Sequence, residues 1–276
     1  MTVSTGTTTL GDRFGDGVWY GYVVLVALFL MTPLVSLVIA SFYDGRFFSI
    51  VDYEFTLDWY DAALTSGSIR RALLNTLYIS VPVTILSTVI GTAAAIAYTR
   101  YDFPFREEFK LFALLPIFFP LILLGLGISM WASEISLGYG LVPAIISELV
   151  WISPIVMFVV SITALGIDPN IEEAARDLGT DTVTLYREVL LPLIWDGIVS
   201  GAIFAFVLSW NNYYIVSYLS GPQSTITTWI HGRMTQGFTP VVPAVASLIF
   251  YISILLVIAA AVFEYRKLHA KNEDDI

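Results

Sequence analysis

Cysteine is absent from this chain of 276 residues, so it forms no disulfide bond and offers no thiolate to a metal. Charged residues are also scarce, at 13%, whereas an ordinary soluble domain has about 25%. The formal net charge of −10 excludes a polybasic nucleic-acid-binding protein. The sequence also lacks a G-x-x-x-x-G-K-[ST] phosphate-binding loop, a paired nucleophile and base, and a cluster of histidines. We therefore expect neither a catalytic site nor a metal site in this chain.

Apolar residues dominate what is present: they make up 57% of the chain and give a mean hydropathy of +0.79. A helix of about 20 apolar residues crosses the roughly 30 Å hydrocarbon core of a bilayer. The sequence therefore predicts an all-α integral membrane protein with about six transmembrane helices in residues 18–263, between tails at 1–17 and 264–276. The predicted spans are Val18–Phe42, Leu73–Tyr98, Phe109–Ala132, Gly140–Leu165, Leu193–Leu219 and Val241–Phe263.

Lysine and arginine predict the orientation of these spans. With a cytoplasmic N-terminus, the inner segments carry nine of these residues and the outer segments carry four. Because such residues concentrate on the cytoplasmic side, we expect a multi-pass protein of the cell membrane with both termini in the cytoplasm. The excess of acidic residues has two interpretations that charge alone does not separate. It could attract a cationic solute, or it could keep exposed loops hydrated in a high-salt host.

A charged segment at residues 168–192 interrupts the apolar pattern between the fourth and fifth predicted spans. Asp168-Pro169 is typical of a helix start. The negative charges of Glu172 and Glu173 then fall in the first turn, where they suit the helix dipole. Gly179 predicts the end of this helix, because a left-handed cap favours a residue without Cβ. The pattern thus indicates a short helix followed by a sharp corner.

A second short helix is predicted after that corner. Thr180 or Asp181 can cap it, and it is expected to run through Val189 before Leu191-Pro192 turns the chain into the fifth span. Such a hairpin could rest on the membrane surface or dock on a partner protein. Its small apolar face in the first helix consists of Ile171, Ala174, Ala175 and Leu178, which recur at helical spacing.

The spacing within this hairpin resembles the EAA loop of ABC importer permeases. Glu-Ala-Ala is followed after three residues by glycine, after nine more by an aliphatic residue, and after one more by Leu-Pro. Valine stands where isoleucine is common. The resemblance implies the type I ABC importer permease (MetI-like) fold, in which this loop couples the membrane helices to an ATP-hydrolysing subunit. The coupling residues that it implies are Glu173, Ala174, Ala175, Leu178, Gly179, Val189, Leu191 and Pro192.

The same resemblance implies the partners of the chain. They are two ATP-binding-cassette subunits, a second permease subunit expected to be a paralogue, an extracytoplasmic solute-binding protein and membrane lipid, with no nucleic acid. ATP and magnesium would bind to the partner ATPase, so no cofactor is expected in this chain.

The region after the fifth span is similar to the spermidine/putrescine, PotC-like subfamily of these permeases. The similarity includes Leu208–Trp210, a Gly-Pro at Gly221-Pro222, and a glycine and proline at Gly237 and Pro240. Asn211-Asn212 departs from the subfamily, which commonly has acidic residues there. A neutral amide can hydrogen-bond an ammonium group but cannot neutralise its charge, so the identity of the solute stays open.

A lone acid within a span indicates a candidate solute pathway. Charge inside a membrane is costly and by default marks a functional site, and neighbouring aromatic rings can hold a cation over their faces. Two alternatives stay open: tryptophan near the outer boundary can be an interface anchor, and the acid can be solvated near a helix end. The candidate pathway residues are Glu148, Trp151, Trp210, Asn211, Asn212 and Tyr214.

Together these patterns predict a permease subunit of an ABC importer, which would move a small solute inward by alternating access coupled to ATP hydrolysis on a separate subunit. A polyamine is the solute that the resemblance implies. Alternatives are the same machinery with a sugar, ferric iron or an anion, or a stand-alone secondary transporter or channel. A secondary transporter would need ion-coupling groups of its own, and it would leave the cytoplasmic hairpin without a role.

Overall fold

The computed structural model describes residues 10–45, 54–237, 239–252 and 254–255. These residues are almost entirely helical, and their β-structure is limited to an isolated bridge between Tyr43 and Phe55. The chain divides into two compact units, one of residues 1–66 with 233–276 and one of residues 67–232. The predicted tails at 1–17 and 264–276 lie mostly outside the described residues.

The first unit contains helix α1 (Leu10–Ser41), helix α2 (Asp58–Thr65) and a helix at Val241–Ile252. The end of α1 is tied to α2 by a hydrogen bond between the Ser41 and Tyr60 hydroxyls, 2.6 Å apart. The Trp59 indole Nε1 also donates to the Tyr43 carbonyl at 3.0 Å. Most large apolar side chains of α1 are exposed, as expected for a helix whose surroundings are lipid or another membrane subunit.

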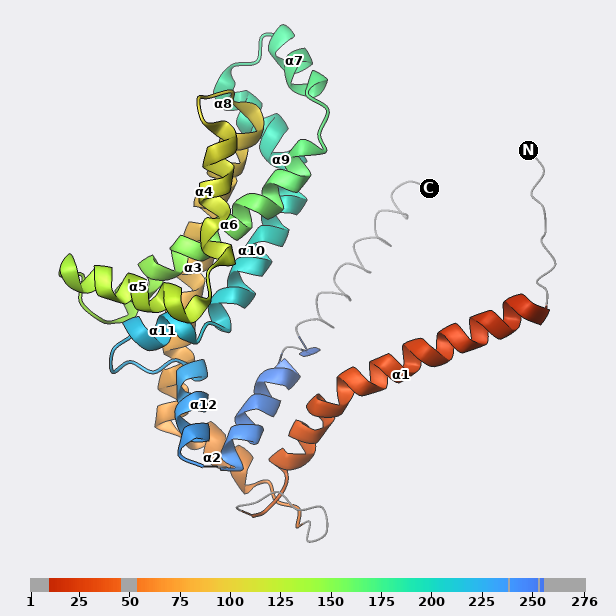
Figure 1. The fold of residues 1–276 in the computed structure, drawn as a ribbon, viewed down its shortest axis with the longest axis vertical. Helices are drawn as coiled ribbons and strands as arrows, with labels where there is room; N and C mark the ends of the chain where they lie inside the picture. The colour runs from red at the N-terminus through yellow and green to blue at the C-terminus, as the bar shows by residue number, and fades with distance from the viewer. Residues whose placement is uncertain (1–9, 46–53, 238, 253, 256–276) are drawn as a thin grey trace. The chain divides into compact units, whose positions relative to one another are not determined.

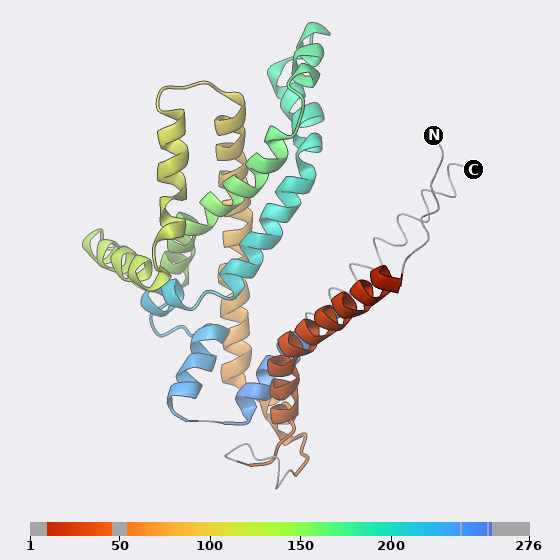
Figure 2. The ribbon, with the colours of Figure 1, turned by 45° about the vertical axis from the view of Figure 1, so that its right-hand side comes forward.

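The second unit is built around three long helices, α3 (Gly67–Arg100), α6 (Leu141–Leu165) and α10 (Trp195–Trp210), which pack against one another (Figure 2). Glycine allows the close approach of these helices. A Cβ atom on Gly91 of α3 would lie 2.6 Å from the Val156 Cβ of α6, which is too close for two carbon atoms. Small residues at crossing points are how membrane helices gain packing contacts that the hydrophobic effect does not supply in lipid.

The third predicted span is not one straight helix. Helix α4 (Arg106–Phe118) and helix α5 (Leu121–Glu134) meet at 105° (Figure 1). The physical reason lies in the sequence at the bend: Phe119 is extended, as a residue before proline prefers to be, and Pro120 has no N–H to continue the helix. The expected Phe109–Ala132 span is therefore two helices joined at a sharp bend rather than one straight helix.

The fifth predicted span is also interrupted. Helix α10 ends at Trp210, and helix α11 (Tyr214–Leu219) begins only after a short non-helical break and packs against α5. At its other end α10 meets the helical segment Thr182–Leu193, which ends in helix α9 (Leu191–Leu193), at an angle of 68°. The expected Leu193–Leu219 span is thus the straight helix α10 with a bent segment at each end.

The remaining helices connect these long ones. Helix α7 (Asn170–Asp177), helix α8 (Thr182–Thr184) and a π-helical turn at Leu185–Leu190 follow α6 and lead into α9. Helix α12 (Ile226–Thr235) follows α11, and the Ile226 backbone N–H donates to the Thr76 hydroxyl of α3 at 2.8 Å.

By length and apolar composition, α1, α3 and α6 can each cross a membrane, and the bent pairs around Pro120 and Ile194 bring the number to as many as five. The first five predicted spans correspond to these elements. The sixth, Val241–Phe263, is seen as the helix Val241–Ile252, and its last residues fall outside the described ranges.

Candidate functional site

The charged segment between α6 and α10 folds into the helical hairpin that its sequence predicts. The Asp168 carboxylate accepts a hydrogen bond from the Asn170 N–H at 3.0 Å, so it caps the start of α7 as expected. We call residues 168–192 the hairpin, with the bounds that the sequence predicts. We call the end of the second unit that contains these residues the hairpin end. Figure 1 shows α7, α8 and α9 together at that end.

Gly179 forms the corner after α7. Its φ angle is +83°, in the left-handed region that disfavours any residue with a Cβ. The Gly179 N–H donates to the Arg176 carbonyl at 2.9 Å, and the Thr180 N–H donates to the Ala175 carbonyl at 3.1 Å. This pair of bonds is the Schellman arrangement that satisfies the last carbonyls of a helix. The predicted role of Gly179 in the corner is confirmed.

Asp181, one of the two predicted caps, starts the second arm of the hairpin. Its carboxylate accepts from the Val183 N–H at 3.0 Å and from the Thr184 hydroxyl and N–H. The hydrogen bond from the Thr184 side chain is the largest of the contributions that hold the pKa of Asp181 below its usual value. The prediction for the end of this arm is corrected: the helix continues past Val189 and through Pro192 to Leu193.

A π-helical turn explains why proline does not stop the second arm. In an α-helix the Pro192 ring would clash with the carbonyl four residues earlier. The turn at Leu185–Leu190 is wider, and the Leu191 N–H that follows it reaches back five residues to the Tyr186 carbonyl. The chain therefore changes direction at Ile194 rather than at Leu191-Pro192.

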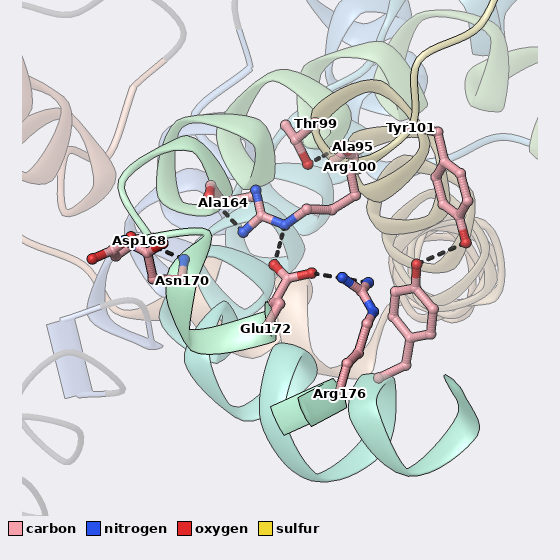
Figure 3. Close-up of polar contacts among 10 residues, drawn as sticks. Ala95, Thr99, Arg100, Tyr101, Ala164, Asp168, Asn170, Glu172 and Arg176 are labelled. Atoms are coloured by element: carbon pink, nitrogen blue, oxygen red, sulfur yellow. Dashed lines mark hydrogen bonds and ion pairs between the residues drawn. The ribbon is translucent and has the colours of Figure 1, made fainter. Parts of the chain in front are cut away.

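Two adjacent glutamates of α7 have opposite environments. Glu172 is 4% exposed and forms an ion pair with Arg100, the last residue of α3 (Figure 3). Its second oxygen lies 3.8 Å from the guanidinium of Arg176. Glu173, the residue that the EAA-like pattern nominates, points its side chain into an exposed environment. From the sequence, Glu172 was expected only to interact favourably with the helix dipole. Its buried ion pair with Arg100 was not predicted.

The hairpin exposes several large apolar side chains among its charged residues. Leu178 is 88% exposed and Val183 is 72% exposed, while Ile171 is 43% exposed. Ala174 and Pro192 are exposed, and Ala175, Val189 and Leu191 are partly buried. A leucine this exposed on a rigid corner is a surface that a partner protein or lipid can cover.

The interior of the second unit holds the lone acid of α6. Glu148 is fully buried, at 0% exposure, and the Ser209 hydroxyl of α10 donates to its Oε2. Its Oε1 atom has no hydrogen-bond partner among the described residues. The alternative of a solvated glutamate near a helix end is therefore wrong: the helix turn around Glu148 is covered by α3 and α10.

Other polar atoms without partners share this interior. The Trp151 indole Nε1, the Ser80 hydroxyl and the Asn212 Nδ2 are all buried and unpaired among the described residues. Ser80, Ser209 and Asn212 line one narrow crevice between α3 and α10. Buried polar groups are usually satisfied, and those without a protein partner call for a bound water, an ion or a functional role.

The six candidate pathway residues separate into two groups. Glu148, Trp151 and Asn212 are buried, and Asn212 also accepts the Ile215 N–H at 3.1 Å, which shapes the break between α10 and α11. Asn211 is exposed and its side chain donates back to the Val207 carbonyl at 2.8 Å. Asn211 and Tyr214 are the exposed members of the set, and the half-buried Trp210 lines the crevice together with Ser209 and Asn212.

Within the described residues, no group of three or more histidine, cysteine, aspartate or glutamate side chains could hold a metal ion. His231 instead stacks on Tyr213, with ring centroids 4.3 Å apart, and its Nδ1 lies 3.0 Å from the tyrosine hydroxyl. The second unit thus combines an exposed hairpin at one end with a buried polar cluster among α3, α6 and α10.

Comparison with known proteins identifies the family. Residues 87–268 match the model of the binding-protein-dependent transport system inner membrane component, which covers more than half of the chain and includes the whole hairpin. The chain belongs to this family, and it is a multi-pass permease component of an ABC importer.

Individual relatives agree with this assignment. The spermidine/putrescine transport system permease protein PotC of Escherichia coli strain K12 is 26% identical over 92% of this chain and 96% of that protein. The putrescine transport system permease protein PotI of the same strain is 27% identical over 80% and 81%. The ferric transport system permease protein FbpB of Actinobacillus pleuropneumoniae is 26% identical over 80% of this chain and 34% of that protein.

Solved structures share the fold. A bacterial ABC transporter involved in the import of the acidic polysaccharide alginate superposes with a TM-score of 0.69 at 16% identity, over 95% of this chain and 99% of that chain. The bacterial alginate ABC transporter in complex with an alginate pentasaccharide-bound periplasmic protein gives 0.64 at 18% identity, over 90% and 91%. The predicted type I importer permease fold is confirmed.

Proposed function

We propose that this chain imports a polyamine, such as spermidine or putrescine, by alternating access driven by ATP hydrolysis on a separate subunit. The similarity to the PotC and PotI permeases over most of the chain is the observation that supports the solute class. The buried carboxylate of Glu148 adds a group that can interact with an ammonium ion inside the membrane region.

The hairpin is the proposed docking element for the ATPase. Its corner is fixed by backbone bonds at Gly179, so the exposed Leu178 and Glu173 are presented on a defined surface rather than on a loose loop. An apolar side chain surrounded by charge suits a groove in a soluble partner. The distribution of arginine and lysine supports a cytoplasmic location of the hairpin, where ATP is available.

Three kinds of partner follow from this proposal. Two ATP-binding-cassette subunits would bind ATP and magnesium, so this chain needs no nucleotide site of its own. A second permease subunit, a paralogue, would complete the translocation pathway. An extracytoplasmic solute-binding protein would deliver the polyamine at the end opposite the hairpin. The solved alginate transporter in complex with a periplasmic protein provides a precedent for the last of these within the same fold.

The proposed pathway uses the buried members of the candidate set. Glu148, with the Ser209 hydroxyl on one oxygen and the other oxygen free, would pair with one ammonium group of the solute during passage. Trp151 and Asn212 would contribute an aromatic face and an amide. In the described conformation these groups are closed off by helices, so passage requires α3, α6 and α10 to separate.

Reconstitution tests this proposal. The chain is co-expressed with its neighbouring permease, ATPase and solute-binding genes, and uptake of radiolabelled spermidine into proteoliposomes is measured with and without ATP. Glu173→Lys is expected to abolish uptake and to reduce co-purification of the ATPase, because it reverses the charge on the exposed face. Glu108→Lys is the matched control, since Glu108 is exposed at the hairpin end but belongs to α4. Wild-type uptake by Glu173→Lys would refute the docking role.

Ferric iron is a second candidate solute. The relative FbpB, a ferric transport system permease protein, is the observation that favours it. The same proteoliposome assay distinguishes the two solutes. ATP-dependent accumulation of iron-55 without accumulation of spermidine would identify ferric iron as the solute.

A further inference from the structure

Arg100 connects three helices at the hairpin end. It is the last residue of α3, and its Nη2 donates to the Ala164 carbonyl near the end of α6 at 3.0 Å. Its Nε forms the ion pair with Glu172 of α7 (Figure 3). The side chains of this pair are only 11% and 5% exposed. One guanidinium thus holds the ends of α3 and α6 and the first arm of the hairpin.

Each of these contacts answers a structural need. The last carbonyls of a helix lack the usual helical partner, and the Ala164 carbonyl at the end of α6 accepts from Arg100 in addition to the Ile167 N–H. The Glu172 carboxylate is buried and requires a cation nearby, because an unpaired buried charge is strongly unfavourable. The planar guanidinium presents several donors in a fixed geometry, so it can serve both partners at once, which a lysine ammonium does less well.

The second arm of the hairpin is attached next to Arg100. The hydroxyls of Tyr101 and Tyr186 are 2.7 Å apart, and Tyr186 lies in the π turn (Figure 3). Tyr101 is exposed, so this bond competes with water and holds less firmly than the buried ion pair. The Arg176–Glu172 contact, at 3.8 Å with Arg176 55% exposed, is also the weaker of the two ion pairs of Glu172.

We propose that Arg100 is the positioning residue that makes the hairpin, α3 and α6 move as one body. This inference rests on the proposed function, in which the ATPase displaces the hairpin. Helices α3 and α6 carry Ser80 and Glu148 of the buried polar cluster. A displacement of the hairpin is therefore transmitted to the buried polar cluster through Arg100. The exposed docking face around Leu178 is not part of this connection.

Loss of the Arg100 connection is expected to uncouple hydrolysis from transport. The ATPase would still dock, because Glu173 and Leu178 are unchanged, and it would still hydrolyse ATP. The number of solute molecules imported per ATP hydrolysed would fall. This ratio separates a positioning role from a merely structural one, since partial unfolding lowers uptake and hydrolysis together.

The experiment uses the reconstituted full complex with its solute-binding protein, with radiolabelled spermidine as the probe. Arg100→Gln is expected to retain ATPase co-purification and to lower the imported spermidine per ATP by about tenfold or more, because a buried ion pair is broken. The paired exchange of Arg100→Glu with Glu172→Arg is expected to recover part of the ratio, since it restores the ion pair but not the bond to Ala164. Asp102→Asn is the control, because it removes an exposed ion pair two residues away and should leave the ratio unchanged.

A wild-type ratio in Arg100→Gln would overturn the inference. If that variant fails to insert, Arg100→Lys decides: the inference predicts an intermediate ratio, and a wild-type ratio refutes it. A wild-type complex that imports no spermidine would instead refute the proposed solute. The coupling is then measured as stimulation of ATP hydrolysis by the solute-binding protein, which Arg100→Gln should lose and Asp102→Asn should keep.

Discussion

Replacement of Gly179 tests the geometry of the hairpin corner directly. At a φ of +83° a residue with a Cβ costs about 1–2 kcal/mol relative to glycine. No atom lies within 4 Å of the position that a Cβ would take, so this cost comes from the backbone alone and not from a clash. A cost of that size reduces the population of the correct corner about 5- to 30-fold relative to competing conformations.

Three replacements of Gly179 are expected to reduce uptake to different degrees. Asparagine tolerates the left-handed region and should retain most uptake and ATPase co-purification. Alanine should be intermediate, and the β-branched valine should abolish uptake while the protein remains inserted in the membrane. Gly232→Ala is the control, because Gly232 lies in helix α12 with open space around it and alanine suits a helix. Full uptake with Gly179→Val, or equal activity of all three variants, would refute this reasoning.

Two further predictions concern Glu148 and Asp181. Glu148→Gln keeps an acceptor for the Ser209 hydroxyl but removes the negative charge, so spermidine uptake should fall while insertion is normal; unchanged uptake would exclude this acid as a cation site. Asp181→Ala should speed amide hydrogen exchange at Val183 and Thr184 in the intact complex, whereas Asp181→Asn should not, and equal exchange in both would exclude the cap. Because the pKa of Asp181 is lowered in the folded protein, its stabilising contribution is present above its unfolded pKa of about 3.9. That contribution is lost only as the pH falls through the lower pKa that Asp181 has in the folded protein. The amide exchange rates at Val183 and Thr184 should therefore show no effect of Asp181 titration near neutral pH.

The local features of the hairpin were predictable from sequence. A capping acid at Asp168, a glycine at position 179 and an acid at position 181 each act through backbone groups a few residues away, and the chain alone specifies those neighbours. The end of the second arm was not predictable, because Pro192 is normally a helix stop and the π turn that accommodates it has no reliable sequence signal.

Contacts between distant helices were beyond sequence reasoning. Two adjacent glutamates look equivalent in the sequence, and only the folded structure shows that Glu172 is buried beside Arg100 at the end of α3 while Glu173 is exposed. The same holds for Asn212, which is buried beside α3 while its neighbour Asn211 is exposed. The bend at Pro120 had a signal in the proline, but neither its 105° angle nor the contact of α5 with α11 could be predicted from it.

The claim that an ATPase covers the hairpin from the cytoplasm has a direct test. The chain contains no cysteine, so Leu178→Cys introduces a single thiol at a position that is 88% exposed. Labelling with a membrane-impermeant maleimide is measured in inside-out and right-side-out vesicles, with and without the ATPase subunits. We predict labelling only in inside-out vesicles and protection when the ATPase is bound. Labelling from the outside, or equal labelling in the presence and absence of the ATPase, would contradict the account.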